Sequence, residues 1–488
     1  MADRISRRAM LKTAGAAAGA ATVLGAVGGL ASAGAAVLRP STARAATDAG
    51  LTGRIVRPAD VTYEAARQGW DALFSSYPSV IVFAQEATDV VNALTWARRH
   101  DTALRVRSGR HSLEGWSSTD GGMVIDVSDL KSIEIDRNAK TATVGTGVTQ
   151  GELVAALAGT GLGFPTGDEA GVGLGGVVLG GGIGVLSRQM GVGCDNLLAV
   201  EMVVSSGPHG ARLVRADQTH NPDLLWACRG GGGGNFGVAT SYTLQLHPMP
   251  ASVVVWQVSW PFDKLHDAFD AWQGWAPGAD RRLGSTLVVL KPSNGISIDG
   301  VFLGAQTDLG NMLEPVTSVA GATVKMSSTS WADRYKNINS GPRQNAYWKF
   351  TPSWASRKLS PAALDTVGEF MSKAPADACN FWSLAWGGKV KSPPPGGTAF
   401  FHRSPLFYAE PGAGWNDASL TEACMTWIGE FREAMLDHVE GGYVNVPDRA
   451  IAEFGPSYYG TNFARLRQVK AKWDPREVFH FEQSIPPA

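Results

Sequence analysis

The sequence predicts an α+β protein of two domains, and three observations support this fold class. Short apolar strands alternate with amphipathic helices at the start, dense glycine segments follow, and the pattern changes at His247–Pro250. From there on, β-rich runs alternate with longer helical stretches, as in an antiparallel sheet with helices on one face. A chain of 488 residues is long enough for this arrangement. We place the first domain at about 50–250 and the second at about 251–440.

The first domain is predicted to open with a helix and then a β-α-β unit. The helix covers Asp60–Phe74, with Asp60 as its N-cap, and the unit comprises Val80–Phe83, Thr88–His100 and Ala103–Val106. Later strands are expected at Met123–Val127, Ser132–Ile135, Lys140–Gly145 and Gly237–Leu246. Helices are expected at Thr149–Ala158 and Asn221–Cys228, and a hairpin at Asn196–Ser205 with Ala211–Arg215.

The second domain shows strand and helix patterns in alternation. Its clearest strands are Val253–Trp260, Ser285–Leu290 and Ile296–Phe302. Its clearest helices are Phe262–Trp275, Pro361–Ser372 and Ala418–Leu436. Lys391–Gly397 contains three prolines and is predicted to be a surface loop, and a helix at Asn462–Trp473 should end at Asp474.

The N-terminus has the pattern of a twin-arginine signal peptide. Arg7 and Arg8 precede an uncharged run of alanine and glycine at Thr13–Leu38, and Ala43–Ala45 offers a cleavage site between small residues. A membrane anchor is the alternative, because the run is long enough to span, but alanine and glycine make it weakly hydrophobic. We therefore expect residues 1–45 to direct export of the folded protein to the cell envelope or the medium, with no stable membrane association afterwards.

Charge and cysteine content exclude some classes. Without residues 1–45 the chain has 37 basic and 43 acidic residues and no basic stripe, which argues against nucleic acid as a partner. Four cysteines are too few for a disulfide scaffold. Buried free thiols are favoured, although export would permit one bridge between Cys379 and Cys424.

The stretch Leu104–Ser112 runs from a strand into a glycine-bearing turn that ends on a histidine. Ser108, Gly109 and Arg110 could cradle an anionic group while His111 faces the ligand, and an ordinary surface turn is the alternative. A second glycine-rich segment favours the cradle.

Two glycine-rich stretches would let the backbone approach a ligand closely. They are this second segment, Gly171–Gly184, and the five glycines Gly230–Gly234. Gly171-x-Gly173-x-x-Gly176 satisfies the dinucleotide fingerprint, but no β-branched strand precedes it and no suitable acidic residue follows. The segment therefore favours a non-Rossmann nucleotide cradle over a Rossmann site or a flexible linker.

Several motifs, in this order, resemble the FAD-linked oxidases of the berberine-bridge-enzyme type, in the vanillyl-alcohol-oxidase superfamily with its PCMH-type FAD-binding fold. The motifs are Val106–Ser112, Leu179–Gly184, Cys194–Leu197, Asp223–Gly230, Gly234–Thr240, Tyr443–Asn445, Asp474-Pro475 and Gln483–Pro486. The resemblance covers about 50–250 and 400–488, is loose between 260 and 390, and implies that residues 441–488 return to the FAD domain.

The resemblance implies that His111 bonds covalently to the 8α-methyl group of the flavin, which needs a neutral imidazole. It implies cofactor contacts from Arg107, Ser108, Gly109, Arg110, His111, Ser112, Gly171, Val172, Gly175, Gly176, Gly182, Gly237, Val238 and Asn445. Many relatives have a second bond through a cysteine, whose place here falls near Glu169. Cys194 belongs to a later element, so we expect one covalent bond, at His111.

Flavin oxidation also needs a base for the substrate O–H or N–H proton. The family often has Tyr-x-Asn-Tyr, whereas this chain has Tyr443-Val-Asn-Val446, which makes Tyr443 the leading base, or else a packing residue. Alternatives for the base are Tyr347, His402, Tyr408 and Glu410. The tryptophans Trp348, Trp354, Trp382 and Trp386 could wall a sugar or aromatic site, or belong to the core.

We expect an exported oxidase that transfers hydride from an alcohol carbon of a carbohydrate or hydroxylated secondary metabolite to FAD, with O₂ reduced to H₂O₂. An amine or alkaloid C–N oxidase, and a dehydrogenase with another electron acceptor, are alternatives within the enzyme class. The missing second tyrosine also leaves a flavin-carrying binding protein without turnover as an alternative.

Overall fold

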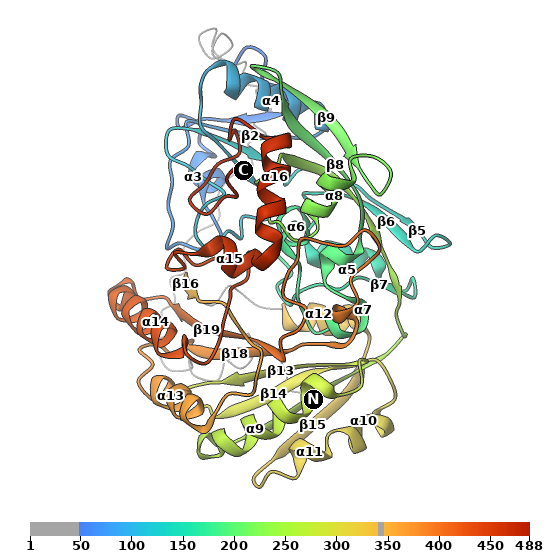
Figure 1. The fold of residues 1–488 in the computed structure, drawn as a ribbon, viewed down its shortest axis with the longest axis vertical. Coiled ribbons are helices and arrows are strands. Elements are labelled where there is room, and N and C mark those ends of the chain that lie inside the picture. Colours follow the sequence, from blue (N-terminus) through green and yellow to red (C-terminus); the bar gives the residue numbers. More distant parts are fainter. Residues whose placement is uncertain (1–47, 340–345) are drawn as a thin grey trace, which may run out of the picture.

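Two large sheets and a small two-stranded one lie in the first half of the chain, and an eight-stranded sheet, called the third sheet below, lies in the second half (Figure 1). The computed structural model describes residues 48–339 and 346–488, so the predicted signal peptide lies outside the described residues. The first sheet has the order β1-β2-β4-β3, in which β2 and β3 both run parallel to β4. Its strands are β1 (Arg54–Val56), β2 (Val80–Phe83), β3 (Leu104–Arg107) and β4 (Met123–Asp126). The predicted β-α-β unit is confirmed, with β4 inserted between its strands and α4 (Ala87–Arg99) packed against them.

The helix predicted at Asp60–Phe74 is wrong in length. Helix α3 spans only Tyr63–Arg67, and its N-cap is Thr62 rather than Asp60. Beyond it, the backbone N–H of Trp70 donates to a carbonyl in the turn after β3. Hydrogen bonding to a distant turn therefore overrides the local helical pattern.

The second sheet is antiparallel and has the order β5-β6-β10-β8-β9. Its strands are β5 (Ile133–Asp136), β6 (Thr141–Gly145), β8 (Leu197–Ser206), β9 (Gly210–Ala216) and β10 (Val238–Gln245). The predicted hairpin is confirmed as the pair β8 and β9. Other elements here are α5 (Gln150–Leu157), β7 (Leu162–Gly163), α6 (Leu174–Gly180), α7 (Ser187–Met190), α8 (Pro222–Cys228) and β11 (His247–Pro248).

Helix α6 lies inside the segment Gly171–Gly184, which the sequence analysis interpreted as a nucleotide cradle. Leu174 and Val178, one helical turn apart, are both fully buried. Burial of these two side chains in the core offsets the low helix propensity of the glycines around them.

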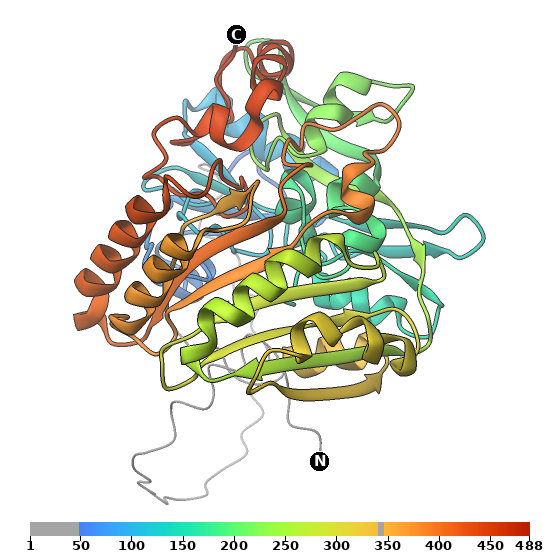
Figure 2. The same cartoon turned by 60° about the horizontal axis from the view of Figure 1, so that its bottom comes forward.

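The third sheet has the order β15-β12-β14-β13-β18-β19-β16, with β17 paired to β19. Its strands are β12 (Val253–Trp260), β13 (Leu283–Val289), β14 (Ile296–Phe302), β15 (Thr323–Thr329), β16 (Tyr347–Phe350), β17 (Ser353–Ala355), β18 (Asn380–Ala385) and β19 (Phe407–Trp415). One face is covered by α9 (Leu265–Trp275), α10 (Gln306–Met312), α11 (Glu314–Thr317), α13 (Pro361–Ser372) and α14 (Thr421–Met435) (Figure 2). The predicted antiparallel sheet with helices on one face is confirmed.

The other face of this sheet looks toward the first half of the chain. Along β13 and β14, Leu287 and Ile298 enter the core under the helices, whereas Thr286 and Asp299 line a cavity on the opposite side. Helix α12 (Trp331–Ile338) packs on that opposite side. The alternation of side chains along the strands therefore gives the cavity one of its walls.

After α14 the chain returns to the first domain, as Figure 1 shows. Helices α15 (Phe454–Tyr459) and α16 (Phe463–Trp473) share a core with the second sheet. Lys470 is fully buried, and its Nζ donates to Asp474 Oδ2 and to two backbone carbonyls, each at 2.7 Å. These bonds fix the last residues of the chain against the first domain.

All four cysteines are buried and free, which confirms the favoured prediction. Cys379 and Cys424, the conceivable bridge, are joined by a thiol hydrogen bond. Within residues 48–339 and 346–488, no helix has the length and apolarity needed to cross a bilayer.

Candidate functional site

A cavity of about 470 Å³ lies between the glycine segments of the first domain and the inner face of the third sheet. This volume is within the range of small-molecule sites. Residues of the C-terminal segment, among them Tyr443, Asn445, Phe481 and Gln483, complete its lining. Three separate parts of the chain therefore meet at one site.

The turn after β3 packs directly on the second glycine segment. A Cβ atom on Gly109 would lie 2.2 Å from the backbone nitrogen of Gly173, so neither position leaves room for a side chain. The Ser108 hydroxyl donates to the carbonyl of Thr146 at 2.7 Å, and Arg110 adopts a φ of 64°. The two stretches that the sequence singled out as a cradle are thus in contact.

His111 projects from this turn into the cavity. Its ring stacks on Trp70 with centroids 5.0 Å apart, and Trp70 in turn stacks on Trp348 at 6.2 Å. A Cβ atom on Gly171 would lie 3.0 Å from His111 Nε2, so the glycine leaves the space that the imidazole occupies. The histidine is therefore held between an aromatic ring and a bare backbone.

Most of the predicted cofactor residues line this cavity. They are Arg107, Ser108, Gly109, Arg110, His111, Ser112, Val172, Gly175, Gly176, Gly237 and Asn445. Gly171, Gly182 and Val238 do not line it, because Gly171 packs behind His111, Gly182 donates to Tyr443, and Val238 is buried in the core. These assignments stay predictions for the cofactor itself.

Besides lining the cavity, Arg107 has a structural role. Its Nε donates to Asp126 Oδ2 at 2.7 Å, and its Nη2 donates to the carbonyl of Ala66 at 2.7 Å. Both charged side chains are almost fully buried. The guanidinium group therefore ties the ends of β3 and β4 together beneath the turn.

Tyr443, the leading candidate for the base, is buried against the second glycine segment. Its hydroxyl oxygen accepts the backbone N–H of Gly182 at 2.8 Å and the side-chain N–H of Asn445 at 2.9 Å. Burial raises the pKa of Tyr443 above its ordinary value, although these two bonds oppose the rise. The neutral phenol therefore predominates near neutral pH.

Glu410 and Tyr408 occupy the opposite wall, on β19. The Tyr408 hydroxyl donates to Glu410 Oε2 at 2.8 Å, and both side chains are buried and line the cavity. Trp382, the cross-strand neighbour of Glu410, lines it as well. A buried carboxyl group beside an aromatic surface can accept a proton from a hydroxyl group.

The remaining alternatives lie outside the cavity lining. His402 stacks on Trp354 and contacts the carbonyl of Ser457, and burial lowers the pKa of His402 to about 4. Tyr347 stacks on Trp415 and packs against the core under the helices. Of the four tryptophans, Trp348 and Trp382 line the cavity, whereas Trp354 and Trp386 are core residues.

Cys194 also lies outside the cavity lining, whereas Glu169 belongs to it. The thiol is fully buried, and its burial raises the pKa of Cys194 well above the ordinary value. The backbone N–H of Cys194 donates to the carbonyl of Gly181 at 2.7 Å. The residue therefore supports the turn at the end of α6.

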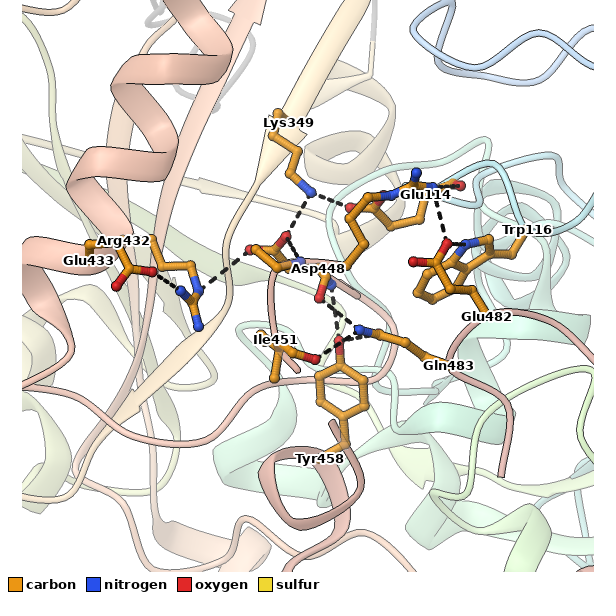
Figure 3. Close-up of polar contacts among 12 residues, drawn as sticks. Glu114, Trp116, Lys349, Arg432, Glu433, Asp448, Ile451, Tyr458, Glu482 and Gln483 are labelled. Atoms are coloured by element: carbon orange, nitrogen blue, oxygen red, sulfur yellow. Dashed lines mark hydrogen bonds and ion pairs between the residues drawn. The ribbon is translucent and has the colours of Figure 1, made fainter. Parts of the chain in front are cut away.

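A buried ionic cluster joins the three parts of the chain beside the cavity (Figure 3). Lys349 of β16 bonds to Glu114, which follows His111 by three residues, and to Asp448 at 2.9 Å. Arg449 Nε donates to the other oxygen of Glu114 at 2.8 Å, and Arg432 of α14 approaches Asp448 within 3.9 Å. The cluster therefore couples the position of the turn to the sheet and the tail.

The cavity residues that sequence analysis missed include Trp70, Thr286, Asp299 and Arg334. One signal was present, because Asp299 is a lone acidic residue within the apolar run Ile296–Phe302. In the described parts of the chain, no cluster of three metal-ligating side chains occurs.

Comparisons with known proteins agree with this geometry. Residues 78–209 match the family model described as FAD binding domain, and residues 442–486 match the one described as berberine and berberine like. The chain is 42% identical to the FAD-linked oxidoreductase YvdP of Bacillus subtilis, over 90% of this chain and 99% of that protein. It is 31% identical to the aclacinomycin-N/aclacinomycin-A oxidase of Streptomyces galilaeus, over 99% of each.

Two solved structures share the fold. The BBE-like 1 protein of Physcomitrella patens superposes with a TM-score of 0.84 at 27% identity, over 92% of this chain and 100% of that one. A glycopeptide hexose oxidase complexed with teicoplanin superposes with a TM-score of 0.81 at 28% identity, over 89% of this chain and 99% of that one.

Proposed function

Because the chain belongs to the berberine-bridge-enzyme-like FAD-linked oxidoreductases, we propose that it oxidises an alcohol carbon of a carbohydrate or hydroxylated secondary metabolite. The substrate loses a hydride from carbon and a proton from oxygen, so the alcohol becomes a carbonyl group. When bound, FAD accepts the hydride and passes two electrons to O₂, which leaves as H₂O₂. The observation that carries this proposal is the cavity in which His111 and the glycine segments face Glu410 and Tyr408.

The residues around the cavity fit a dinucleotide. A Cβ atom on Gly176 would meet nothing within 4 Å, and one on Gly233 would meet only the Cα of Gly176, 3.6 Å away. Two backbone segments therefore border open space without side chains, which suits a pyrophosphate group. These segments and the turn 108–112 would hold FAD.

Covalent attachment at His111 is part of the proposal. The imidazole lines the cavity and its ring is fixed by stacking on Trp70. A fixed, neutral imidazole is the form that can attack the flavin methyl carbon. Glu169, which stands near the family's cysteine position, has no thiol to form a second bond.

Proton transfer is assigned to Glu410, with Tyr443 as the second candidate. The carboxyl group of Glu410 can take the substrate proton, and the hydrogen bond from Tyr408 orients it. Burial raises the pKa of Tyr443 despite the two hydrogen bonds that its oxygen accepts, and this supports a packing role. Tyr443 as the base stays a prediction, and kinetics of Glu410→Gln and Tyr443→Phe distinguish the two residues.

Two names among the relatives support the substrate class. One is an aclacinomycin oxidase and another is a glycopeptide hexose oxidase. The inner wall of the cavity, with Trp382, Tyr408 and Glu410, combines aromatic surface with acceptors for hydroxyl groups. Such a lining suits sugars better than purely apolar ligands.

The test is to add a panel of sugars, alcohols and amines to the purified protein without oxygen. Oxidation bleaches the visible flavin absorption, and air then restores the colour and releases peroxide. A binding protein without turnover would shift the flavin spectrum without bleaching it. Bleaching by amines alone would show that the substrate is an amine oxidised at its C–N bond and not an alcohol. Bleaching that air does not reverse would indicate a dehydrogenase.

Export by the twin-arginine route is proposed from Arg7 and Arg8 in the N-terminal pattern. Expression in a host that lacks the twin-arginine translocase should leave the protein inside the cell. The change of both arginines to lysine should have the same result, and continued export of that variant would contradict the proposal.

A further inference from the structure

The outer side of the third sheet holds a pair of cysteines that the proposed oxidase function does not use. Cys379 immediately precedes β18, and Cys424 lies one turn into α14, in the same core cluster. Both side chains are fully buried, and a hydrogen bond joins the two thiol groups. The two sulfur atoms are therefore already neighbours across a helix–sheet interface, which a disulfide between them requires.

Contacts on either side of the pair hold α14 against the sheet. Near the start of the helix, the Thr421 hydroxyl accepts an indole N–H from β19 at 2.9 Å. Further along, the ring of Phe431 stacks on Phe381 of β18, with centroids 5.7 Å apart. Cys424 lies between these two contacts, and Cys379 is two residues from Phe381. The packing of the whole interface therefore keeps the two thiols together.

The two thiols of the pair differ in acidity. The hydrogen bond from Cys379 lowers the pKa of Cys424 below its ordinary value, against the effect of burial. The same bond, together with burial, raises the pKa of Cys379. Because the thiolate is the nucleophile in thiol oxidation, Cys424 is suited to react first and Cys379 to close the bridge.

The other two cysteines provide a contrast within the same chain. Cys194 and Cys228 are also fully buried, but they belong to two different core clusters. Burial raises the pKa of both thiols above the ordinary value. We therefore expect these two thiols to stay reduced under conditions in which the pair reacts.

We propose that Cys379 and Cys424 close to a disulfide when the protein meets hydrogen peroxide, and that this bridge locks α14 onto the third sheet. The sulfur of Cys424 attacks one peroxide oxygen, the O–O bond breaks, and the other oxygen leaves as water with the thiol proton. The sulfur of Cys379 then attacks the oxidised sulfur, the S–O bond breaks, and a second water leaves. Two thiols and one H₂O₂ thus give one disulfide and two waters.

The bridge goes beyond the proposed function and does not depend on it, because the test supplies the peroxide. H₂O₂ is also the product proposed for the oxidase. Trp382 of β18 lines the cavity, whereas the adjacent Phe381 belongs to the core under the helices. Turnover would therefore release the oxidant on the opposite face of the strand that Cys379 precedes.

The segment between the two cysteines carries part of the cavity wall. It contains β18 and β19 with Trp382, Tyr408 and Glu410. A disulfide restricts the unfolded chain, so closing this segment should stabilise the folded wall. Because both thiols are buried, peroxide has to wait for a local opening of α14, and bridging should be slow.

The experiment treats the flavin-loaded protein with H₂O₂ and follows its thiols. Samples are denatured, free thiols are labelled with a maleimide and counted by mass, and unreduced peptides are mapped. The unchanged chain should lose two of its four thiols and yield one linked peptide that contains Cys379 and Cys424. Cys194→Ala is the matched control and should yield the same peptide, whereas Cys424→Ala should yield no linked peptide.

The bridged protein should also unfold at a higher urea concentration. Its equilibrium constant for unfolding should fall by about ten-fold or more, and dithiothreitol should reverse the change. Urea too dilute to unfold the protein should speed bridging, because local opening exposes the thiols. If Cys424→Ala fails to fold, the peptide map and the urea shift of the unchanged chain decide.

Three results would overturn the proposal. The first is a protein that keeps all four thiols, and the second is a linkage through Cys194 or Cys228. The third is oxidation of Cys424 to sulfinic acid without a linked peptide. A bridged protein that is no more resistant to urea than the reduced one would overturn the lock on α14.

Discussion

The two walls of the cavity are built in different ways. The first-domain wall is backbone, where Gly109 and Gly173 are in contact and Gly176 faces open space. The wall from the third sheet is made of side chains, such as Trp382 and Glu410, that alternate with core residues along the strands. A backbone wall can hold a ligand whose shape does not vary, whereas a side-chain wall can change its ligand by single substitutions.

The largest effect tests the backbone wall, through the side chain that projects from it. In His111→Ala the denatured, acid-precipitated protein should lose its yellow colour completely, because no other side chain is expected to bond to the flavin. The absorbance of the precipitate and of the supernatant measures this. Cys194→Ala is the control and should stay yellow, and a yellow His111→Ala precipitate would show that the attachment site is elsewhere.

The next effect tests the side-chain wall. Glu410→Gln keeps the shape of the side chain but removes the acceptor for the substrate proton, so kcat should fall by about 10²–10⁴-fold. Tyr443→Phe should lower kcat by less, because burial raises the pKa of the Tyr443 hydroxyl above its ordinary value. The rate of anaerobic flavin bleaching measures both. The reverse order of effects would transfer the role of base to Tyr443.

A third prediction concerns the cluster that joins the two walls. Lys349→Met leaves Glu114 and Asp448 buried without their shared partner, and the free energy of unfolding should fall by about 3–5 kcal/mol. Lys358→Met removes an exposed pair with Asp270 and should cost less than about 1 kcal/mol. Urea unfolding gives both values, and similar values for the two variants would mean that the cluster does not hold the walls together.

A fourth prediction concerns pH at the seam between the third sheet and the tail. Burial lowers the pKa of His402 from 6.5 to about 4, so the unfolded chain binds more protons between these values. The stabilisation is complete above pH 6.5 and decreases as the pH falls toward 4, by at most about 3 kcal/mol. His402→Gln should flatten this dependence in urea unfolding at pH 7 and pH 4.5. An unchanged slope would rule out His402 as its source.

The smallest effect returns to the backbone wall. Gly176→Ala places a methyl group in open space within α6, so the flavin-free protein should gain about 0.5–1 kcal/mol. The same methyl group occupies the cavity, so flavin loading should fall. Thermal unfolding and the flavin-to-protein absorbance ratio measure the two effects, and unchanged loading would place the cofactor away from Gly176.

The different construction of the two cavity walls explains why the sequence predicted the residues of the first-domain wall better than those of the third-sheet wall. Glycine spacing and a turn ending on His111 marked the backbone wall directly, because only a few residue types suit such a conformation. Trp382 and Glu410 were named only among alternatives, and Asp299 and Arg334 were missed, because their placement depends on the register of distant strands. The expected helix at Asp60–Phe74 failed for a similar reason, since Trp70 bonds to a turn about forty residues away.

The tail has a consequence for biosynthesis. Phe481 and Gln483 line the cavity, and Lys470 anchors the segment that carries them. These residues are synthesised after the rest of the cavity lining, so the nascent chain has an open-sided cavity until they have been added. We therefore expect FAD to be captured only after these residues have been added, and any passage of the loaded enzyme across a membrane to follow that capture.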